Sequence, residues 1–392
     1  MNKKRGENMY YLGICENVLA ETNSFNTAKE IHTQTEIWTK AVDYYEANKE
    51  KIEAFLEKVG KDAQVIFTGA GTSEYVGNIL APMLNSMQEG DFRSIATTDI
   101  VNNPLHYLKK DKKVLLVSFA RSGNSPESVA TINLANQLVK EVYHLFITCN
   151  PEGELAQMAT TPEYVNNTLV LMMPEGSNDK GFAMTSSFSS MLMTAMLVFY
   201  NKTSAANMRE VIALVEKERD AKLETIKAIA NEDQDRIIVL GDGPFKGLAE
   251  ELTLKVMELT AGKVVAKSDT TLGFRHGPKS IINKNTIVFL LLSSEAHSRK
   301  YALDILTEMK SEDVANNIVT YSLKDCDCVK EASKVVVSPA VEINLEKAIF
   351  TYLIYGQMYA FFKSQHFNLT TDNPFPSGEV NRVVKKFQIY EF

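Results

Sequence analysis

Val65-Ile-Phe-Thr-Gly-Ala-Gly71 is the pattern of a buried strand that breaks into a glycine loop. Ile237-Ile-Val-Leu-Gly-Asp-Gly243 repeats the pattern 172 residues later (241 minus 69). Two further pairs of apolar runs keep this spacing to within one residue: Val114–Ser118 with Thr286–Leu290, and His144–Thr148 with Asn317–Tyr321. A register held over three strands predicts two copies of one fold. Their second loops differ in chemistry, because Arg121–Pro126 in the first copy corresponds to Ser293–Ser298 in the second.

Each copy contains five short apolar runs separated by helical patterns. The runs are Gln64–Thr68, Ser94–Thr97, Val114–Ser118, His144–Thr148 and Thr168–Met172 in the first copy, and Arg236–Leu240, Val264–Lys267, Thr286–Leu292, Asn317–Tyr321 and Val335–Val337 in the second. Continuous apolar strands that alternate with helices are typical of parallel sheets covered on both faces. The sequence therefore predicts an α/β protein with two doubly wound, flavodoxin-like lobes.

Length and composition limit the possible classes of protein. The 392 residues are 45% hydrophobic and 23% charged, which is typical of a folded globular protein with two or three domains. A net charge of -7 argues against nucleic acid as a partner. The most apolar run, residues 191–200, is too short to span a membrane, and no signal-peptide core follows the N-terminus, so we expect a cytoplasmic protein. The four cysteines suggest no disulfide framework, and Cys326-Asp-Cys328 is interpreted as structurally neutral.

The boundaries that we expect follow the repeat. Residues 1–50 form an N-terminal helical segment, residues 51–215 the first lobe, residues 216–365 the second lobe and residues 366–392 a C-terminal tail. The boundary between the lobes is placed in a charged helix around Glu216–Asp233, and the tail is expected to end in a strand at Phe387–Tyr390.

Two loops of the first copy have the chemistry of a phosphate site. Thr68–Glu74 and Ser118–Glu127 combine small residues, hydroxyls and free amides at helix starts, at the sheet edge where doubly wound folds bind ligands. Ser125 and Pro126 suit the first positions of a helix, and Arg121 adds a cation. Helix caps without a ligand are the alternative for either loop alone, but two such loops with an arginine favour phosphate. Neither glycine pair has the third glycine of a dinucleotide site and no Walker lysine pattern is present, so we expect no nucleotide cofactor.

Glu258 and His276 are the candidates for acid and base chemistry. Glu258 ends a helix predicted over residues 244–261, in which Glu251, Lys255 and Glu258 share one face. From these residues alone, a surface ion pair between Lys255 and Glu258 is the favoured interpretation. His276 lies between Arg275 and a Gly-Pro turn, which is typical of a rigid loop, and a structural loop histidine is the alternative to a catalytic one.

These motifs together resemble the sugar isomerase (SIS) domain proteins, with two SIS lobes. Thr68–Ser73 and Ser118–Ser125 are similar to the sugar-phosphate loops of that family. Leu254–Glu258 followed by Arg275–Pro278 resembles the isomerase half of glucosamine-6-phosphate synthase. The narrower likeness is to the AgaS family of galactosamine-6-phosphate deaminase/isomerases, formerly called tagatose-6-phosphate ketose/aldose isomerases. That likeness covers nearly the whole chain and depends on Gly181–Phe188 and on Asp372–Val384.

The resemblance implies roles for individual residues. It implies that Glu258 is the base at the substrate carbon, that His276 assists ring opening from the neighbouring subunit of a homodimer, and that a C-terminal lysine falls near Lys385, with Lys386 adjacent. The residues implied to bind the sugar phosphate are Gly71, Thr72, Ser73, Arg121, Ser122, Asn124, Ser125, Ser186 and Ser187. Arg121 replaces a glutamine and Ser186 a lysine of the synthase, so contacts to the sugar differ there. The resemblance implies no metal or other cofactor.

The expected activity is conversion of D-galactosamine 6-phosphate to D-tagatose 6-phosphate and ammonia. The chain has no amidotransferase domain and Asn2 is not a nucleophilic cysteine, which favours amine release over amine transfer. Aldose–ketose isomerisation without deamination, glucosamine-6-phosphate deamination and a sugar-phosphate sensor without catalysis are the alternatives. The sequence leaves open whether the substrate is galacto or gluco, and whether the second lobe binds an effector.

Overall fold

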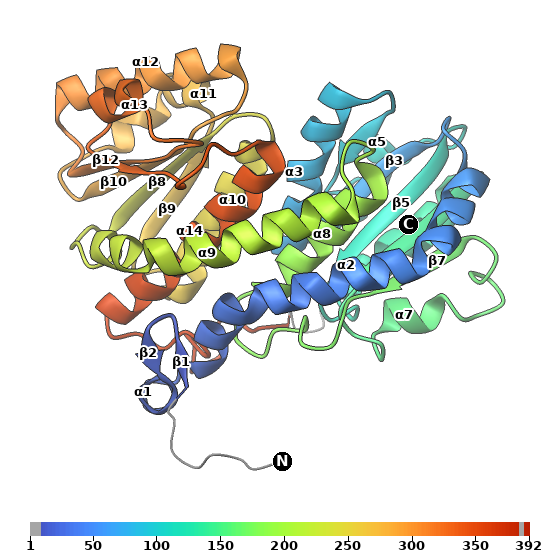
Figure 1. Ribbon diagram of the computed structural model, residues 1–392. Coiled ribbons are helices and arrows are strands. Elements are labelled where there is room, and N and C mark those ends of the chain that lie inside the picture. The colour runs from blue at the N-terminus through green and yellow to red at the C-terminus, as the bar shows by residue number, and fades with distance from the viewer. Residues whose placement is uncertain (1–8, 384–387) are drawn as a thin grey trace.

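The computed structural model describes residues 9–383 and 388–392. It contains two five-stranded parallel sheets that lie side by side, with helices around and between them (Figure 1). In these residues no helix combines the length and the apolar character needed to cross a membrane.

The first sheet has the strand order β4-β3-β5-β6-β7, as expected for a flavodoxin-like lobe. Its elements are β3 (Gln64–Thr68), α3 (Thr72–Met87), β4 (Phe92–Ser94), α4 (Thr97–Asn102), α5 (Pro104–Tyr107), β5 (Lys113–Ala120), α6 (Pro126–Leu138), β6 (Glu141–Thr148), α7 (Glu154–Met158) and β7 (Thr168–Met172). β3 and β5 are neighbours, with Thr68 opposite Ser118. The loops after these two strands therefore open side by side, at the point where the strand order reverses and where such sheets bind ligands.

The second sheet repeats this topology in the order β12-β11-β10-β8-β9. Its elements are β8 (Arg236–Gly241), α10 (Pro244–Leu259), β9 (Val265–Asp269), α11 (Thr271–Phe274), the 3-10 helix η1 (Pro278–Ile281), β10 (Thr286–Leu291), α12 (Ala296–Glu312), β11 (Asn317–Tyr321), α13 (Asp327–Ala332) and β12 (Val335–Val337). The glycines before the two first helices share one backbone conformation, with φ of 55° at Gly71 and 58° at Gly243. The duplication predicted from the sequence is confirmed.

Helices from both ends of the chain fill the space between the sheets (Figure 1). The remaining elements are β1 (Tyr10–Tyr11), β2 (Ile14–Cys15), α1 (Glu16–Glu21), α2 (Phe25–Val59), α8 (Ser186–Phe199), α9 (Ala205–Ala230) and α14 (Leu345–His366). α14 packs on α9 and α10, and α2 packs on α8 and α9. One continuous hydrophobic core joins Phe67 and Leu192 to Phe245 and Tyr352, so the two lobes share their interior.

Several details differ from the sequence predictions. The strand predicted at Ser94–Thr97 is observed as β4 at Phe92–Ser94. The predicted run was placed too late, because its last residue, Thr97, already begins the helix α4. Residues 388–392 form no strand, and Phe387 lies outside the described residues. Cys326 and Cys328 are paired in a disulfide, so the expectation of a structurally neutral pair was wrong. α9 passes through residue 216 without a break, and the domain boundaries stay predictions.

Candidate active site

The two equivalent helices α3 and α10 pack against each other and thereby bring the lobes together. A Cβ atom on Gly247 would lie only 2.6 Å from the Asn78 carbonyl carbon, so glycine is needed for this approach. Asn78 Nδ2 also donates to Glu250 Oε2 across the contact, at 2.8 Å. The crossing places the last turns of α10 beside the first turn of α3, where the glycine loop ends.

A cavity of about 300 Å³ opens at this junction. It is bordered by both hydroxyl-rich loops of the first lobe, by the end of α10 and by the C-terminal tail. The lining residues are Ala70–Ser73, Phe119–Ser122, Ser125, Glu127, Ser128, Phe182, Met184, Leu254, Glu258 and Val380–Val383. Glu258 therefore faces the same cavity as Ser73, Arg121 and Ser125, although its sequence position is in the other lobe.

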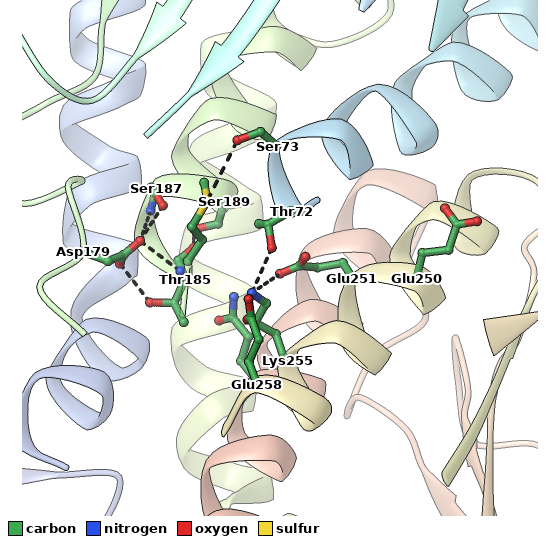
Figure 2. A network of polar contacts seen from close by, with 12 residues as sticks. Thr72, Ser73, Asp179, Thr185, Ser187, Ser189, Glu250, Glu251, Lys255 and Glu258 are labelled. Carbon is green, nitrogen blue, oxygen red and sulfur yellow. Dashed lines mark hydrogen bonds and ion pairs between the residues drawn. The ribbon is translucent and has the colours of Figure 1, made fainter. Parts of the chain in front are cut away.

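Lys255 links the lobes inside this site (Figure 2). Its ammonium group lies 2.5 Å from Glu258 Oε2 and 3.6 Å from Glu251 Oε1, and it donates to Thr72 Oγ1 of α3 at 2.9 Å. The side chains of Lys255 and Glu251 are fully buried, and that of Glu258 is 23% exposed. The ion pair between Lys255 and Glu258 that the sequence favoured is present, but its expected location on the surface is wrong. The polar face of α10 is turned toward α3, and only Glu258 reaches the open cavity.

Burial changes the protonation of this cluster. Desolvation, together with the nearby charge of Glu258, raises the pKa of Glu251 to about 8, although Lys255 acts in the opposite direction. For Lys255, burial alone would lower the pKa, but the carboxylates of Glu251 and Glu258 outweigh burial and raise it. The raised pKa values of both groups favour a protonated Glu251 beside a charged Lys255, and the ammonium group lies nearer to Glu258 than to Glu251.

Arg121 lines the same cavity and is fixed by hydrogen bonds to two backbone carbonyls. Its guanidinium group is almost completely buried and donates to the Phe182 carbonyl at 3.1 Å and to the Arg382 carbonyl. Arg382 in turn donates to the Gly181 carbonyl at 3.2 Å and to Asn178 Oδ1 at 3.1 Å. The tail is thus tied across the cavity through backbone and side-chain contacts. Burial and the charge of Arg382 lower the pKa of Arg121.

Three loop hydroxyls predicted to bind substrate are in this cavity. Ser73 Oγ lies 3.9 Å from Met184 Sδ, a weak contact that leaves the hydroxyl available. Ser122 and Ser125 border the cavity from the second loop. Thr68 Oγ1 at the end of β3, Ser118 Oγ in β5 and Glu127 Oε2 at the start of α6 are buried without a hydrogen-bond partner among the described residues. Gly71 and Thr72, two other residues predicted to bind substrate, also line the cavity. The Thr72 hydroxyl already accepts a hydrogen bond from Lys255.

Other predicted residues lie elsewhere. Asn124 is outside the cavity, and its Oδ1 accepts from the Glu154 amide at 2.9 Å. Ser186 and Ser187 are completely buried at the start of α8, where Asp179 accepts from both backbone amides at 2.8 and 3.0 Å (Figure 2). An internal carboxylate therefore occupies the helix start at the two serines that the family resemblance implied for the sugar phosphate. His276 is exposed and does not line the cavity of its own chain, and Lys385 lies outside the described residues.

The sequence reasoning missed four residues of this site. It did not assign Glu251 or Lys255 to the site, although it placed both on the face of Glu258. The i, i+4, i+7 spacing of three charges on one helix face was the available signal. Glu127 ended the predicted loop Ser118–Glu127 but was given no role. Arg382 gave no comparable signal, because only the folded chain brings the tail to this cavity.

Comparisons with known proteins agree with this architecture. Residues 59–200 match the SIS domain family, which covers the first lobe. The chain is 39% identical to D-galactosamine-6-phosphate deaminase AgaS of Escherichia coli over 92% of this chain and 94% of the relative. The chain belongs to the AgaS family.

Solved structures extend the AgaS likeness to the whole fold. The crystal structure of tagatose-6-phosphate ketose/aldose isomerase from Escherichia coli is 36% identical, with a TM-score of 0.85, and covers 94% of this chain and 96% of that chain. A structure from Clostridium novyi NT is 39% identical, with a TM-score of 0.93, and covers 98% of this chain and 100% of that chain. The likeness to these solved structures therefore extends over both lobes and the helices between them.

Proposed function

We propose that this protein is an amino-sugar-phosphate deaminase that converts D-galactosamine 6-phosphate and water to D-tagatose 6-phosphate and ammonia. The AgaS relatives from Escherichia coli and Streptomyces coelicolor, at 39% and 38% identity, both bear the name D-galactosamine-6-phosphate deaminase, the second with the prefix "Putative". The observation that carries the proposal is the position of Glu258, a carboxylate of the second lobe in the same cavity as the hydroxyl-rich loops of the first.

The loops of the first lobe would hold the phosphate. Ser73, Ser122 and Ser125 offer hydroxyls near the starts of α3 and α6, where the helix dipoles favour an anion. The buried Arg121 supplies a fixed positive charge beside them. With the phosphate held there, the sugar carbons extend toward Glu258 at the other end of the cavity.

The reaction then follows from the acidity of the carbon that carries the amine. Once the ring is open, the C1 aldehyde acidifies the C2 proton, and Glu258 removes that proton. Reprotonation at C1 converts the enaminol into a ketimine at C2, water adds to the ketimine, and ammonia leaves with formation of the C2 ketone. Lys255 is placed to stabilise the Glu258 carboxylate, and the C-terminal lysine near residue 385 stays a prediction.

A homodimer would supply the missing proton carrier. His276 is exposed and does not line the cavity of its own chain, so we propose that it reaches the cavity of a second copy and assists ring opening there. The active site would then be complete only in the dimer. We further propose a cytoplasmic location, where sugar phosphates are consumed.

Ammonia release tests the activity. We expect purified protein to release ammonia from galactosamine 6-phosphate faster than from glucosamine 6-phosphate, with tagatose 6-phosphate as the second product. Glu258→Gln keeps the shape of the side chain but removes the base, so the rate should fall by about 10² to 10⁴-fold. Glu224→Gln, an exposed position on α9, is the matched control and should leave the rate unchanged.

Three outcomes would reject this function. Ammonia release that persists in Glu258→Gln would remove Glu258 from the mechanism. Conversion of tagatose 6-phosphate to an aldose phosphate without any ammonia chemistry would make the protein a simple isomerase. Saturable binding of these phosphates without turnover would indicate a sensor.

A further inference from the structure

The turn that carries His276 has little secondary structure of its own. α11 is only four residues long, Thr271–Phe274, and the histidine follows two residues later. The His276 amide bonds back to the Gly273 carbonyl at 3.0 Å, so the orientation of α11 sets the position of the histidine backbone. A short helix of this kind needs contacts from other elements to hold it in one place.

One such contact comes from the loop that corresponds to the glycine loop of the first lobe. Asp242 stands between Gly241 and Gly243, where the first lobe has Ala70 between Gly69 and Gly71. The backbone of the two loops is alike, as the nearly equal φ and ψ angles of Gly71 and Gly243 show. The side chain is therefore the main difference between the two loops at this point.

The Asp242 carboxylate binds the first residue of α11 with both oxygens. Oδ1 accepts from the Thr271 amide at 3.1 Å, and Oδ2 accepts from Thr271 Oγ1 at 2.7 Å. Ser298 Oγ, at the start of α12, lies 3.5 Å from Oδ2. Thr271 is buried, so water does not compete freely for these bonds, and hydrogen bonds to a charged acceptor are stronger than neutral ones.

Within the turn itself, Thr270 Oγ1 accepts from the Gly273 amide at 3.0 Å and caps the start of α11, and Asp269 Oδ1 accepts from the Thr270 amide at 2.8 Å. Two contacts with other parts of the second lobe act further along the turn. Phe274 is completely buried in the core of the second lobe, and the Arg275 guanidinium lies 2.9 Å from Glu308 of α12. These contacts fix the end of α11 and the residue before the histidine. Asp242 fixes the beginning of the helix, so the turn is held at both ends.

We propose that Asp242 is a positioning residue for His276. In this duplicated fold, the loop that binds ligand in the first lobe has become, in the second lobe, a support for the turn that carries the catalytic histidine. The inference rests on the proposed function, because it requires His276 to take part in turnover.

The test combines substitutions at three positions with steady-state kinetics on galactosamine 6-phosphate. Asp242→Ala removes both bonds, and we expect kcat to fall by about tenfold to a hundredfold with KM little changed, because the histidine is misplaced while the phosphate loops are intact. Asp242→Asn keeps one acceptor oxygen and should restore most of kcat. Thr271→Val removes only the hydroxyl bond and should give a smaller loss. Asp304→Ala, an exposed aspartate on α12, is the matched control.

The decisive comparison is made in the His276→Ala background. If Asp242 acts through His276, Asp242→Ala should cause no further loss of kcat once the histidine is absent. Independent, multiplicative losses would overturn the proposal, as would a kcat equal to that of the wild type in Asp242→Ala or in His276→Ala. Melting temperatures identify variants that fail to fold. If Asp242→Ala does not fold, Asp242→Asn and Thr271→Val are compared with and without His276→Ala instead. Failure of the proposed function is distinct, since the unmodified protein would then release no ammonia.

Discussion

At the scale of single residues, the unusual feature is a lysine buried completely between two carboxyl groups. Removing Lys255 from water is costly, and the cost is offset by the ion pair with Glu258 and the bond to Thr72. Protonation of Glu251 lowers the number of charges that must be compensated. The cluster then contains one ion pair, between Lys255 and Glu258, and the Glu258 carboxylate lines the cavity.

Replacing the lysine tests this account. Lys255→Met keeps the bulk of the side chain but leaves Glu258 without its partner beside the buried Glu251. We expect the free energy of unfolding to fall by about 3–5 kcal/mol and kcat to fall by about a hundredfold or more. Lys246→Met, an exposed lysine on the same helix, is the control, and urea unfolding with ammonia assays provides the measurements. Unchanged stability and activity in Lys255→Met would contradict the account.

The raised pKa of Glu251 has a consequence for stability. Its pKa is about 8 in the fold, against an ordinary value of 4.5, so between these pH values the unfolded chain has lost a proton that the folded chain keeps. The protonated Glu251 side chain therefore makes its full contribution to the free energy of unfolding below pH 4.5. That contribution is lost as the pH rises to about 8. Glu30, partly buried near Asp179 and also with a pKa raised to about 8, adds in the same direction.

Glu251→Gln should flatten this dependence, since glutamine resembles the protonated form at every pH. We expect the variant to gain stability relative to the original chain as the pH rises from 5 to 8, by on the order of 1–3 kcal/mol. Thermal unfolding over that pH range measures the difference. A parallel slope for both proteins would show that Glu251 is already ionised at neutral pH.

At the scale of elements, the site depends on how closely α3 and α10 approach. Gly247→Ala would place a Cβ atom within 2.8 Å of the Asn78 and Ile79 backbone, which cannot move as a flexible side chain can. We expect a loss of about 1–3 kcal/mol of stability and a lower kcat, because the end of α10 shifts relative to the phosphate loops. Lys246→Ala on the exposed face is the control. Full activity in Gly247→Ala would mean that the lobes tolerate a wider separation.

Elements of this fold could be predicted from the sequence to within a few residues. Gln64–Thr68 and Asn317–Tyr321 were predicted with their observed bounds, because strands buried on both faces are continuous apolar runs ended by turn residues. The bounds of the partly buried edge strand Val335–Val337 were also predicted correctly. The direction in which a helix face points was harder to predict. The charged face of α10 looked like a solvent face, and only the packing of α3 against it turns Lys255 inward.

The same limit applies to helix starts. Ser186 and Ser187 have the residue types of an anion site, but Asp179 already accepts from their amides. Whether a helix start is free or occupied depends on tertiary contacts that no local pattern contains. Asp242 shows the same feature in the second lobe.

At the scale of the whole molecule, the duplication separates two tasks between the lobes. The first lobe keeps the open loops beside a buried arginine, and the second contributes Glu258 through α10 and displays His276 on a supported turn. Because His276 is exposed and outside its own cavity, the proposed composite site needs two chains in which each contributes a different residue.

Mixing two inactive variants tests that arrangement directly. Glu258→Gln and His276→Ala homodimers each lack one component at both sites, whereas a heterodimer would contain one site with both components and one site with neither. Random exchange of equal amounts makes half of the dimers heterodimers, so we expect recovery of about one quarter of the original activity. Ammonia release after brief partial denaturation and refolding of the mixture measures it, with each variant treated alone as the control. If the mixture stays inactive while size-exclusion chromatography of tagged chains shows that heterodimers form, the histidine and the carboxylate do not meet across a subunit interface.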